Sequence, residues 1–161
     1  MSTVLIPGSF DPLHLGHVDV VDQATALFGD VVVAVLHNPA KPSGMFTPDE
    51  RAELARQALA GRPGVRVAAF GGLVVDAATE VGAVAIAKGV RSAVDYDVEV
   101  QMAHTNRSVT GIQTVLLPCD PALSFVSSRF IREIAARGGR VDHLVPRPVA
   151  AALADRFASP G

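Results

Sequence analysis

The 161-residue sequence lacks the features that mark several classes of protein. It holds one cysteine, Cys119, which excludes a disulfide framework and a cysteine-based zinc site. Its longest apolar runs, such as residues 31–36, fall far short of the ~20 residues that cross a bilayer. The N-terminus has neither a basic segment nor a small-residue cleavage site, so we expect no export signal. These absences predict a soluble, cytoplasmic protein with no membrane partner.

The sequence also lacks an excess of either charge. Its 14 Lys and Arg residues and 16 Asp and Glu residues give a net charge of −2, which argues against nucleic-acid binding. With 49% hydrophobic and 19% charged residues, the composition excludes an intrinsically disordered chain. The length suits one domain, and we predict a single domain over residues 1–161.

Short apolar runs alternate along the chain with helix-like segments. Strands are predicted at residues 3–6, 31–36, 65–70, 83–87 and 114–117. Helices are predicted at residues 17–28, 47–59, 73–81, 95–108, 127–137 and 148–157. Continuous apolar runs are typical of strands covered on both faces, and the alternation indicates right-handed crossovers between parallel strands. The predicted fold is α/β, with a Rossmann-like, doubly wound, five-stranded parallel sheet.

Ligands of open parallel sheets bind beyond the carboxyl ends of the strands, so the segments after the strands are informative. Residues 7–17 form the first of these segments. His14 and His17 are three residues apart at a helix start, and Gly16 between them leaves room for a phosphate. Gly8 would let the backbone approach a ligand closely. The segment predicts a polyphosphate site, with an ordinary turn and a surface histidine as the alternative.

Basic residues follow two other predicted strands. Lys41 lies in the loop after the second strand and is either a phosphate contact or a solvated lysine. Lys88 and Arg91 flank a glycine after the fourth strand, where two cations attract an anion. Salt bridges to Asp95 or Asp97 are the alternative.

Serine, cysteine and glutamate residues complete the candidate set. Ser127 or Ser128 would cap the next helix, and the donors left there either bind a second anion or serve capping alone. Cys119 has no activating histidine in its sequence neighbourhood and is interpreted as structural rather than nucleophilic. Glu99 fits a solvated acidic face of the fourth helix.

The string Gly-Ser-Phe-Asp-Pro-Leu-His-Leu-Gly-His at residues 8–17 resembles the (T/H)xGH signature of the nucleotidyltransferase superfamily. Strings at residues 38–41, 45–47, 88–91, 101–107 and 124–128 resemble those of one of its families, the bacterial phosphopantetheine adenylyltransferases. The resemblance extends from residue 4 to about residue 157. It implies transfer of AMP from ATP to 4′-phosphopantetheine, giving dephospho-CoA and pyrophosphate in coenzyme A biosynthesis. It also implies Mg²⁺ that arrives with ATP, and a homohexamer.

The resemblance assigns roles to individual residues. His17 would stabilise the transition state, and Lys41 and Arg91 would be the other catalytic residues. The implied ATP contacts are Ser9, Phe10, His14, His17, Gly89, Val90, Arg91, Glu99, Leu123, Ser124, Phe125, Val126, Ser127, Ser128 and Arg129. The implied acceptor contacts are Ser9, Lys41, Val74 and Lys88. Arg129 stands where close relatives have a third serine, so it either adds a phosphate contact or points away.

Two other functions stay open at this point. A related nucleotidyltransferase would run the same chemistry on nicotinate mononucleotide or a phospho-alcohol, and only its acceptor pocket would differ. A nucleotide-binding module without catalysis is the second, although the intact His14, His17 and Lys41 count against it. No carboxylate stands at ligand spacing from the two histidines, so no protein-held metal is expected.

Overall fold

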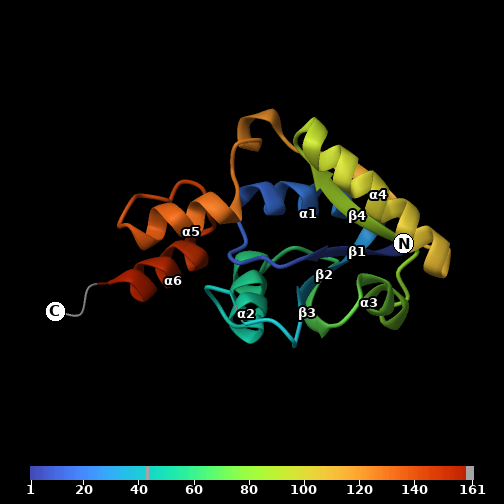
Figure 1. Cartoon of the computed structure of the whole chain (residues 1–161), viewed down its shortest axis with the longest axis horizontal. Helices are drawn as coiled ribbons and strands as arrows, with labels where there is room; N and C mark the ends of the chain where they lie inside the picture. Colours follow the sequence, from blue (N-terminus) through green and yellow to red (C-terminus); the bar gives the residue numbers. More distant parts are fainter. Residues whose placement is uncertain (43, 159–161) are drawn as a thin grey trace.

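Five parallel strands form one sheet in the computed structural model, and helices flank it (Figure 1). The structure describes residues 1–42 and 44–158, so residues 43 and 159–161 of the predicted domain lie outside it. The strands are β1 Ser2–Gly8, β2 Gly29–His37, β3 Val65–Gly71, β4 Ala85–Val90 and β5 Gln113–Pro118. The helices are α1 Leu15–Phe28, α2 Pro48–Ala58, α3 Val74–Glu80, α4 Ala93–Thr110, α5 Ser128–Ala136 and α6 Arg147–Phe157, with a 3-10 turn η1 at Pro121–Leu123.

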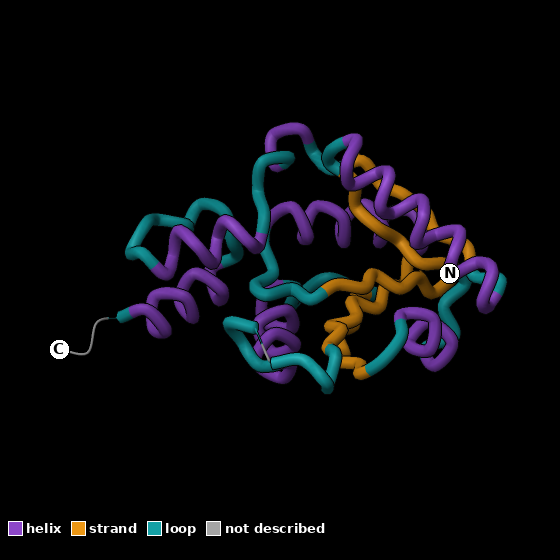
Figure 2. The backbone as a smooth tube through the Cα atoms, in the orientation of Figure 1, coloured by secondary structure: helices purple, strands orange, loops and turns teal. Residues whose placement is uncertain are grey.

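The strand order β3-β2-β1-β4-β5 confirms the doubly wound topology. The chain builds outward from β1 to β3, then returns to place β4 on the other side of β1. The order therefore reverses between β1 and β4, and ligands of such sheets bind in the crevice at that point. The loops that leave the carboxyl ends of the strands, among them the one after β1, are teal in Figure 2.

The largest departure from the predicted elements concerns β4, which runs to Val90 instead of ending at residue 87. Its ladder with β5 continues as far as the pair Val90 and Pro118. The polar Lys88 interrupts the apolar pattern, but backbone pairing does not depend on that pattern. Lys88 and Gly89 are therefore strand residues, held more rigidly than residues of a loop would be.

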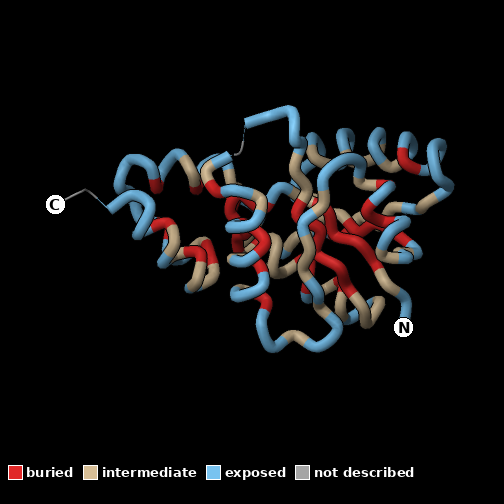
Figure 3. The backbone as a smooth tube through the Cα atoms, turned by 90° about the horizontal axis from the view of Figure 1, so that it is seen from below, coloured by how far each residue is buried: buried red, intermediate tan, exposed pale blue. Residues whose placement is uncertain are grey.

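The core lies along β1 and its neighbour β2, which are buried on both faces (Figure 3). Val4, Val31 and Val33 pack toward α1 and α2, while Leu5 and Val32 pack toward α3. Burying one such side chain contributes about 1.5–3 kcal/mol, so these continuous apolar runs account for much of the stability of the sheet. This double burial is the reason that the strands could be recognised in the sequence.

Helices α5 and α6 pack together beside the sheet around a core cluster of their own (Figure 1). Ile131, Val149 and Leu153 belong to this cluster, and so does Phe46 from the β2–α2 loop. The aromatic side chain of Phe46 is buried there, so it ties that loop to the C-terminal helices. None of the described helices has both the length and the apolar character needed to span a membrane.

Candidate active site

Helix α1 begins with a capping box built from two imidazoles. His14 is the N-cap, and its Nδ1 accepts a hydrogen bond from the backbone N–H of Gly16 at 3.1 Å. The backbone N–H of His14 donates to Nδ1 of His17 at 3.1 Å, and the two rings stack with centroids 3.7 Å apart. Capping boxes ordinarily use Ser or Thr with Glu or Gln. Because each Nδ1 is an acceptor here, a neutral ring must carry its proton on Nε2.

The surroundings keep both imidazoles neutral at pH 7. Burial, and to a lesser degree the charge of Arg91, lowers the pKa of His14 to about 4. Burial also lowers the pKa of His17 well below its ordinary value, helped by His14, Arg91 and Lys88. Each ring therefore offers one Nε2–H donor without a charge of its own, while the cations nearby supply the positive potential.

Phe10 supports His17 from the loop after β1. It has a φ of +48°, in the left-handed region that bulky residues avoid, and its ring is buried. The ring lies edge-on to His17, with centroids 4.9 Å apart and an interplanar angle of 73°. A Cβ at Gly8 would come within 2.9 Å of the Phe10 ring. Gly8 thus makes room for an aromatic side chain, and because it also lines the cavity beside the histidines, the close approach of a ligand there stays a prediction.

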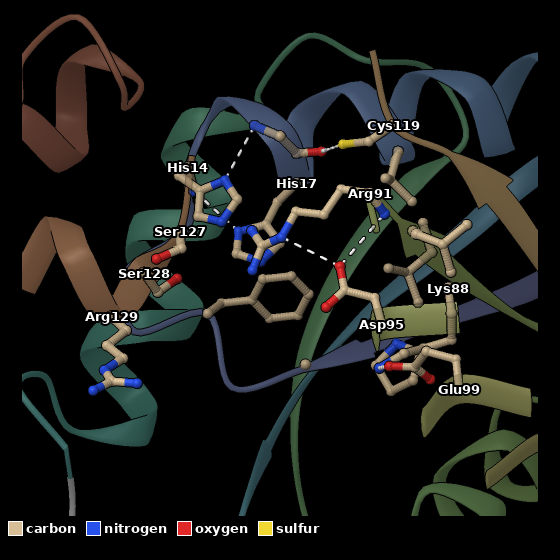
Figure 4. Close-up of a pocket in the computed structure, with 18 of the residues that line it drawn as sticks. His14, His17, Lys88, Arg91, Asp95, Glu99, Cys119, Ser127, Ser128 and Arg129 are labelled. Carbon is tan, nitrogen blue, oxygen red and sulfur yellow. Dashed lines mark hydrogen bonds and ion pairs between the residues drawn. The ribbon is translucent and has the colours of Figure 1, made fainter. Parts of the chain in front are cut away.

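A cavity of about 580 Å³ opens beside these histidines, between β1 and β4 (Figure 4). Its lining carries cations, imidazoles and hydroxyls from segments that are far apart in the sequence. The predicted residues that line it are Gly8, Phe10, His14, Gly16, His17, Lys88, Gly89, Val90, Arg91, Glu99, Ser127, Ser128 and Arg129. This is the crevice that the strand order marks as a ligand site.

Ion pairs hold the two cations of β4 and its following turn. Arg91 Nε lies 3.3 Å from Asp95 Oδ2, and the Arg91 guanidinium also donates to the carbonyl of Val126. Lys88 Nζ lies 3.2 Å from Glu99 Oε1. The salt bridge considered from the sequence is thus present for Arg91, whereas Lys88 pairs with Glu99 from the next helix. All four side chains keep partial exposure, so the pairs do not shut them off from a ligand.

A second helix N-terminus faces the same cavity. Ser127 is the N-cap of α5, where its hydroxyl accepts from the N–H of Phe130 at 3.1 Å. The hydroxyl of Ser128 donates to the carbonyl of Pro12 at 2.8 Å, which fastens α5 to the loop after β1. Figure 4 shows Arg129 directed away from the two histidines, and its guanidinium lies 5.9 Å from the Phe130 ring centroid.

Arg132 lines this cavity and was missed in the sequence analysis. Its Nη1 donates to the carbonyl of Asp11 at 2.8 Å. It follows Ser128 by four residues, one helical turn, so the two share a face of α5. That spacing is the signal from which it could have been found.

A second cavity of about 450 Å³ adjoins the first, and Pro7, Gly8, Lys88 and Glu99 line both. Its lining is mostly apolar, from Leu36, Leu73, Val74, Val75, Ile86, Met102, Ala103 and Val109. Ser9 and Val74, predicted as acceptor contacts, lie here, as do Asn106 and Thr114. Asn106 is buried, and the buried hydroxyl of Thr114 has no hydrogen-bond partner among the described residues. An apolar pocket with few polar groups suits a slender organic ligand.

Several predicted residues lie apart from both cavities. Lys41 is exposed on the β2–α2 loop, where its backbone N–H donates to the carbonyl of Asn38 at 3.0 Å. Leu123, Ser124, Phe125 and Val126 do not line either cavity; Phe125 is 67% exposed, and Val126 is buried in the α5–α6 cluster. Their predicted ligand contacts stay predictions.

Cys119 lines the first cavity, with its Sγ 4.0 Å from the carbonyl of Gly16. Burial first, and then the charge of Asp19, raises the pKa of its thiol, which disfavours the nucleophilic thiolate. Among residues 1–42 and 44–158, no group of three or more His, Cys, Asp or Glu side chains is placed to hold a metal ion.

Comparison with known proteins places this chain in a family. The chain is 49% identical over 150 residues to a phosphopantetheine adenylyltransferase of Cutibacterium acnes, covering 93% of this chain and 95% of that protein. It is 49% identical over 156 residues to the one of Kocuria rhizophila, covering 96% and 99%. A bifunctional NMN adenylyltransferase/ADP ribose pyrophosphatase of Francisella tularensis shares the fold, with a TM-score of 0.75 at 11% identity over 99% of this chain and 50% of that one. The sequence model described as cytidylyltransferase-like matches residues 5–134. The chain therefore belongs to the cytidylyltransferase-like family and, within it, to the phosphopantetheine adenylyltransferases.

Proposed function

We propose that the first cavity binds ATP and the second binds 4′-phosphopantetheine, so that this chain transfers AMP between them to give dephospho-CoA and pyrophosphate. The observation that carries the proposal is the junction of the two cavities at Lys88 and Glu99. A cavity lined by cations and N–H donors suits a polyphosphate, and an apolar one suits the pantetheine arm. The junction is where the acceptor phosphate and the α-phosphate of ATP would meet.

The reaction itself needs alignment and charge stabilisation more than proton transfer. The acceptor phosphate is already ionised at neutral pH, so it attacks without a general base, and pyrophosphate leaves as a stable anion. Alignment of the two reactants is worth ~7–11 kcal/mol at best. Each donor aimed at the charge that develops at the α-phosphate adds roughly 3–4 kcal/mol.

The histidines and cations divide this work. His17 would donate its Nε2–H to the α-phosphate in the transition state, and His14 would hold the phosphates beside it. Arg91 would neutralise phosphate charge in the first cavity. On the acceptor side, Ser9 and Lys88 line the second cavity. Lys41, which lies outside that cavity, would reach the acceptor phosphate from its loop.

The remaining ATP contacts come from the segment that leads into α5. Ser127 and Ser128 would present the N-terminus of that helix to the β- and γ-phosphates, with Arg132 one turn further on. Backbone groups of Gly89 and Val90 lie on the same wall. Further contacts from the resemblance would come from Phe10, Glu99, Leu123, Ser124, Phe125, Val126 and Arg129.

Magnesium would enter with ATP as part of the substrate. The acidic side chains at the first cavity, Asp95 and Glu99, each pair with a cation. The other polar groups there are mainly N–H donors and hydroxyls, which fit phosphate oxygens better than a metal ion. The phosphates and water would therefore hold Mg²⁺, as it prefers.

The homohexamer implied by the resemblance also belongs to this proposal. Helix α4 exposes Val94 and Val98, and such apolar side chains favour contact with another chain. Light scattering of the purified protein would give the mass of the assembly, and a monomer would contradict this part. The cytoplasmic location stays a prediction.

The proposed reaction is tested by pyrophosphate release with ATP and three acceptors. We expect turnover with 4′-phosphopantetheine and none with nicotinate mononucleotide or glycerol phosphate. Turnover with another acceptor alone would reassign the second cavity. Binding of ATP without turnover on any of them would favour the nucleotide-binding module.

A further inference from the structure

Two buried charged side chains join the β1–α1 loop to the β2–α2 loop. Asp11, only 7% exposed, accepts with Oδ1 from the N–H of Phe46 at 2.9 Å and with Oδ2 from the N–H of Met45 at 2.8 Å. Arg51, at the start of α2, donates from Nε to the carbonyl of Phe46 at 3.0 Å and from Nη1 to the carbonyl of Ser9 at 2.9 Å. The two loops are therefore held together by hydrogen bonds that Asp11 accepts and by hydrogen bonds that Arg51 donates.

Gly44 shows how closely the second loop passes the first. A Cβ at this position would overlap Oδ2 of Asp11. Any side chain at residue 44 would push the loop off the carboxylate and weaken the hydrogen bonds that Met45 and Phe46 donate. Asp11 and Gly44 thus pack against each other closely. The effects of substitutions at the two positions should therefore not be additive.

This contact links a loop that is fastened to the first cavity with the loop that carries Lys41. The loop of Asp11 is fastened to α5 by Arg132 and Ser128, which line the first cavity. Lys41 precedes Gly44 by three residues in the loop after β2. That loop lies beside the loop after β1 (Figure 1). Residues 38–42 are exposed, so packing alone does little to fix Lys41.

We propose that Asp11 is a positioning residue that holds the Lys41 loop in place relative to the histidines, with Gly44 as its fitted counterpart. Its carboxylate makes charge-assisted hydrogen bonds, which are shorter and stronger than neutral ones and leave the loop little freedom. Lys41 then meets the acceptor phosphate while His17 meets ATP. This inference rests on the proposed function, in which Lys41 binds the acceptor.

The test compares D11A, G44A and the double variant in steady-state kinetics with full-length enzyme. Each single change should raise KM for 4′-phosphopantetheine by about tenfold, within the range of couplings measured for residues in one hydrogen-bond network. KM for ATP should change by less than about twofold, as expected for a site that is not coupled to the change. The double variant should be no worse than D11A, because the alanine methyl group then occupies space that the carboxylate has left. D155N, an exposed change on α6, is the matched control and should leave both KM values unchanged.

Equal changes in the two KM values would overturn the inference, and so would additive effects of D11A and G44A. If D11A does not fold, the KM values of G44A decide, together with D11N, which keeps one acceptor oxygen and should give an intermediate KM. K41A, measured in parallel, separates this inference from the proposed function. If K41A raises KM for 4′-phosphopantetheine and neither D11A nor G44A does, the positioning role is wrong. If K41A has no effect on that KM, the acceptor role of Lys41 is wrong, and the inference fails with it.

Discussion

The two cavities differ in what their polar groups contact before any ligand binds. In the first, His14 and His17 already accept hydrogen bonds from the backbone, and Ser128 donates to Pro12. In the second, the buried hydroxyl of Thr114 has no partner within the described part of the chain. The first cavity is thus organised in advance, as stabilisation of a transition state requires. The second retains an unsatisfied polar group, a state that costs stability.

The largest effect should come from removing the organised donor of the first cavity. In H17A the α-phosphate loses the Nε2–H, so kcat should fall by about 10²–10³-fold, as for loss of one preorganised donor. Binding of ATP, measured by calorimetry, should persist because Arg91 and the helix N-termini remain.

The matched control for this variant is H143A, which removes an exposed histidine from a loop far along the chain. It should leave kcat unchanged. An H17A enzyme with unchanged kcat would take His17 out of the mechanism, and loss of ATP binding in H17A would make it a binding residue instead.

The cost of organising the first cavity should appear in the pH dependence of stability. The pKa of His14 is about 4 in the folded protein and 6.5 as the ordinary value. Between these pH values the unfolded chain binds a proton that the folded chain does not, so stability falls as pH decreases through this window. His14 accounts for about 3 kcal/mol of that loss, and His17 acts in the same direction.

Urea unfolding at about pH 7 and about pH 5 measures this slope. H14N supplies the control, because asparagine caps a helix well but does not titrate in this range. The variant should lose less stability than the wild type between the two pH values. Equal losses would show that His14 is not the group responsible.

The substitution in the second cavity that corresponds to H17A in the first is N106A. The buried amide of Asn106 would contact the polar groups of the pantetheine arm, so KM for 4′-phosphopantetheine should rise by about tenfold with KM for ATP unchanged. S108A, on the exposed face of the same helix, serves as the control. A rise in KM for ATP instead would place Asn106 on the nucleotide side.

The two cavities also differ in how far the sequence could predict them. The residues of the first cavity belong to short motifs that follow strands, such as His14 to His17. Their side chains indicate phosphate binding from the sequence alone. Even there, the imidazole capping box was missed, because histidine is not an ordinary capping residue. The strands were found because both faces of the central ones are buried, but β4 was cut short where Lys88 interrupts its apolar run.

The lining of the second cavity gave no comparable signal. Leu36, Val75 and Met102 look like core residues in a sequence, and only the folded chain brings them around one space. The pairing of Lys88 with Glu99 was also out of reach, because it depends on how α4 lies against β4. Asp11 meets Gly44, and Arg51 bonds to Ser9, across two loops that are far apart in the sequence, so these contacts exist only in three dimensions.

The smallest expected effect concerns the unpartnered hydroxyl of the second cavity. In T114V this group is replaced by a methyl, so the penalty for burying an unsatisfied hydroxyl disappears and the free energy of unfolding should rise by about 1 kcal/mol. T25V is the matched control, because the Thr25 hydroxyl donates to the carbonyl of Val21 at 2.7 Å and its loss should not stabilise the protein. Urea unfolding of both variants measures the difference. A destabilised T114V would mean that the hydroxyl has a partner in solution, and the two cavities would then be alike in the state of their polar groups.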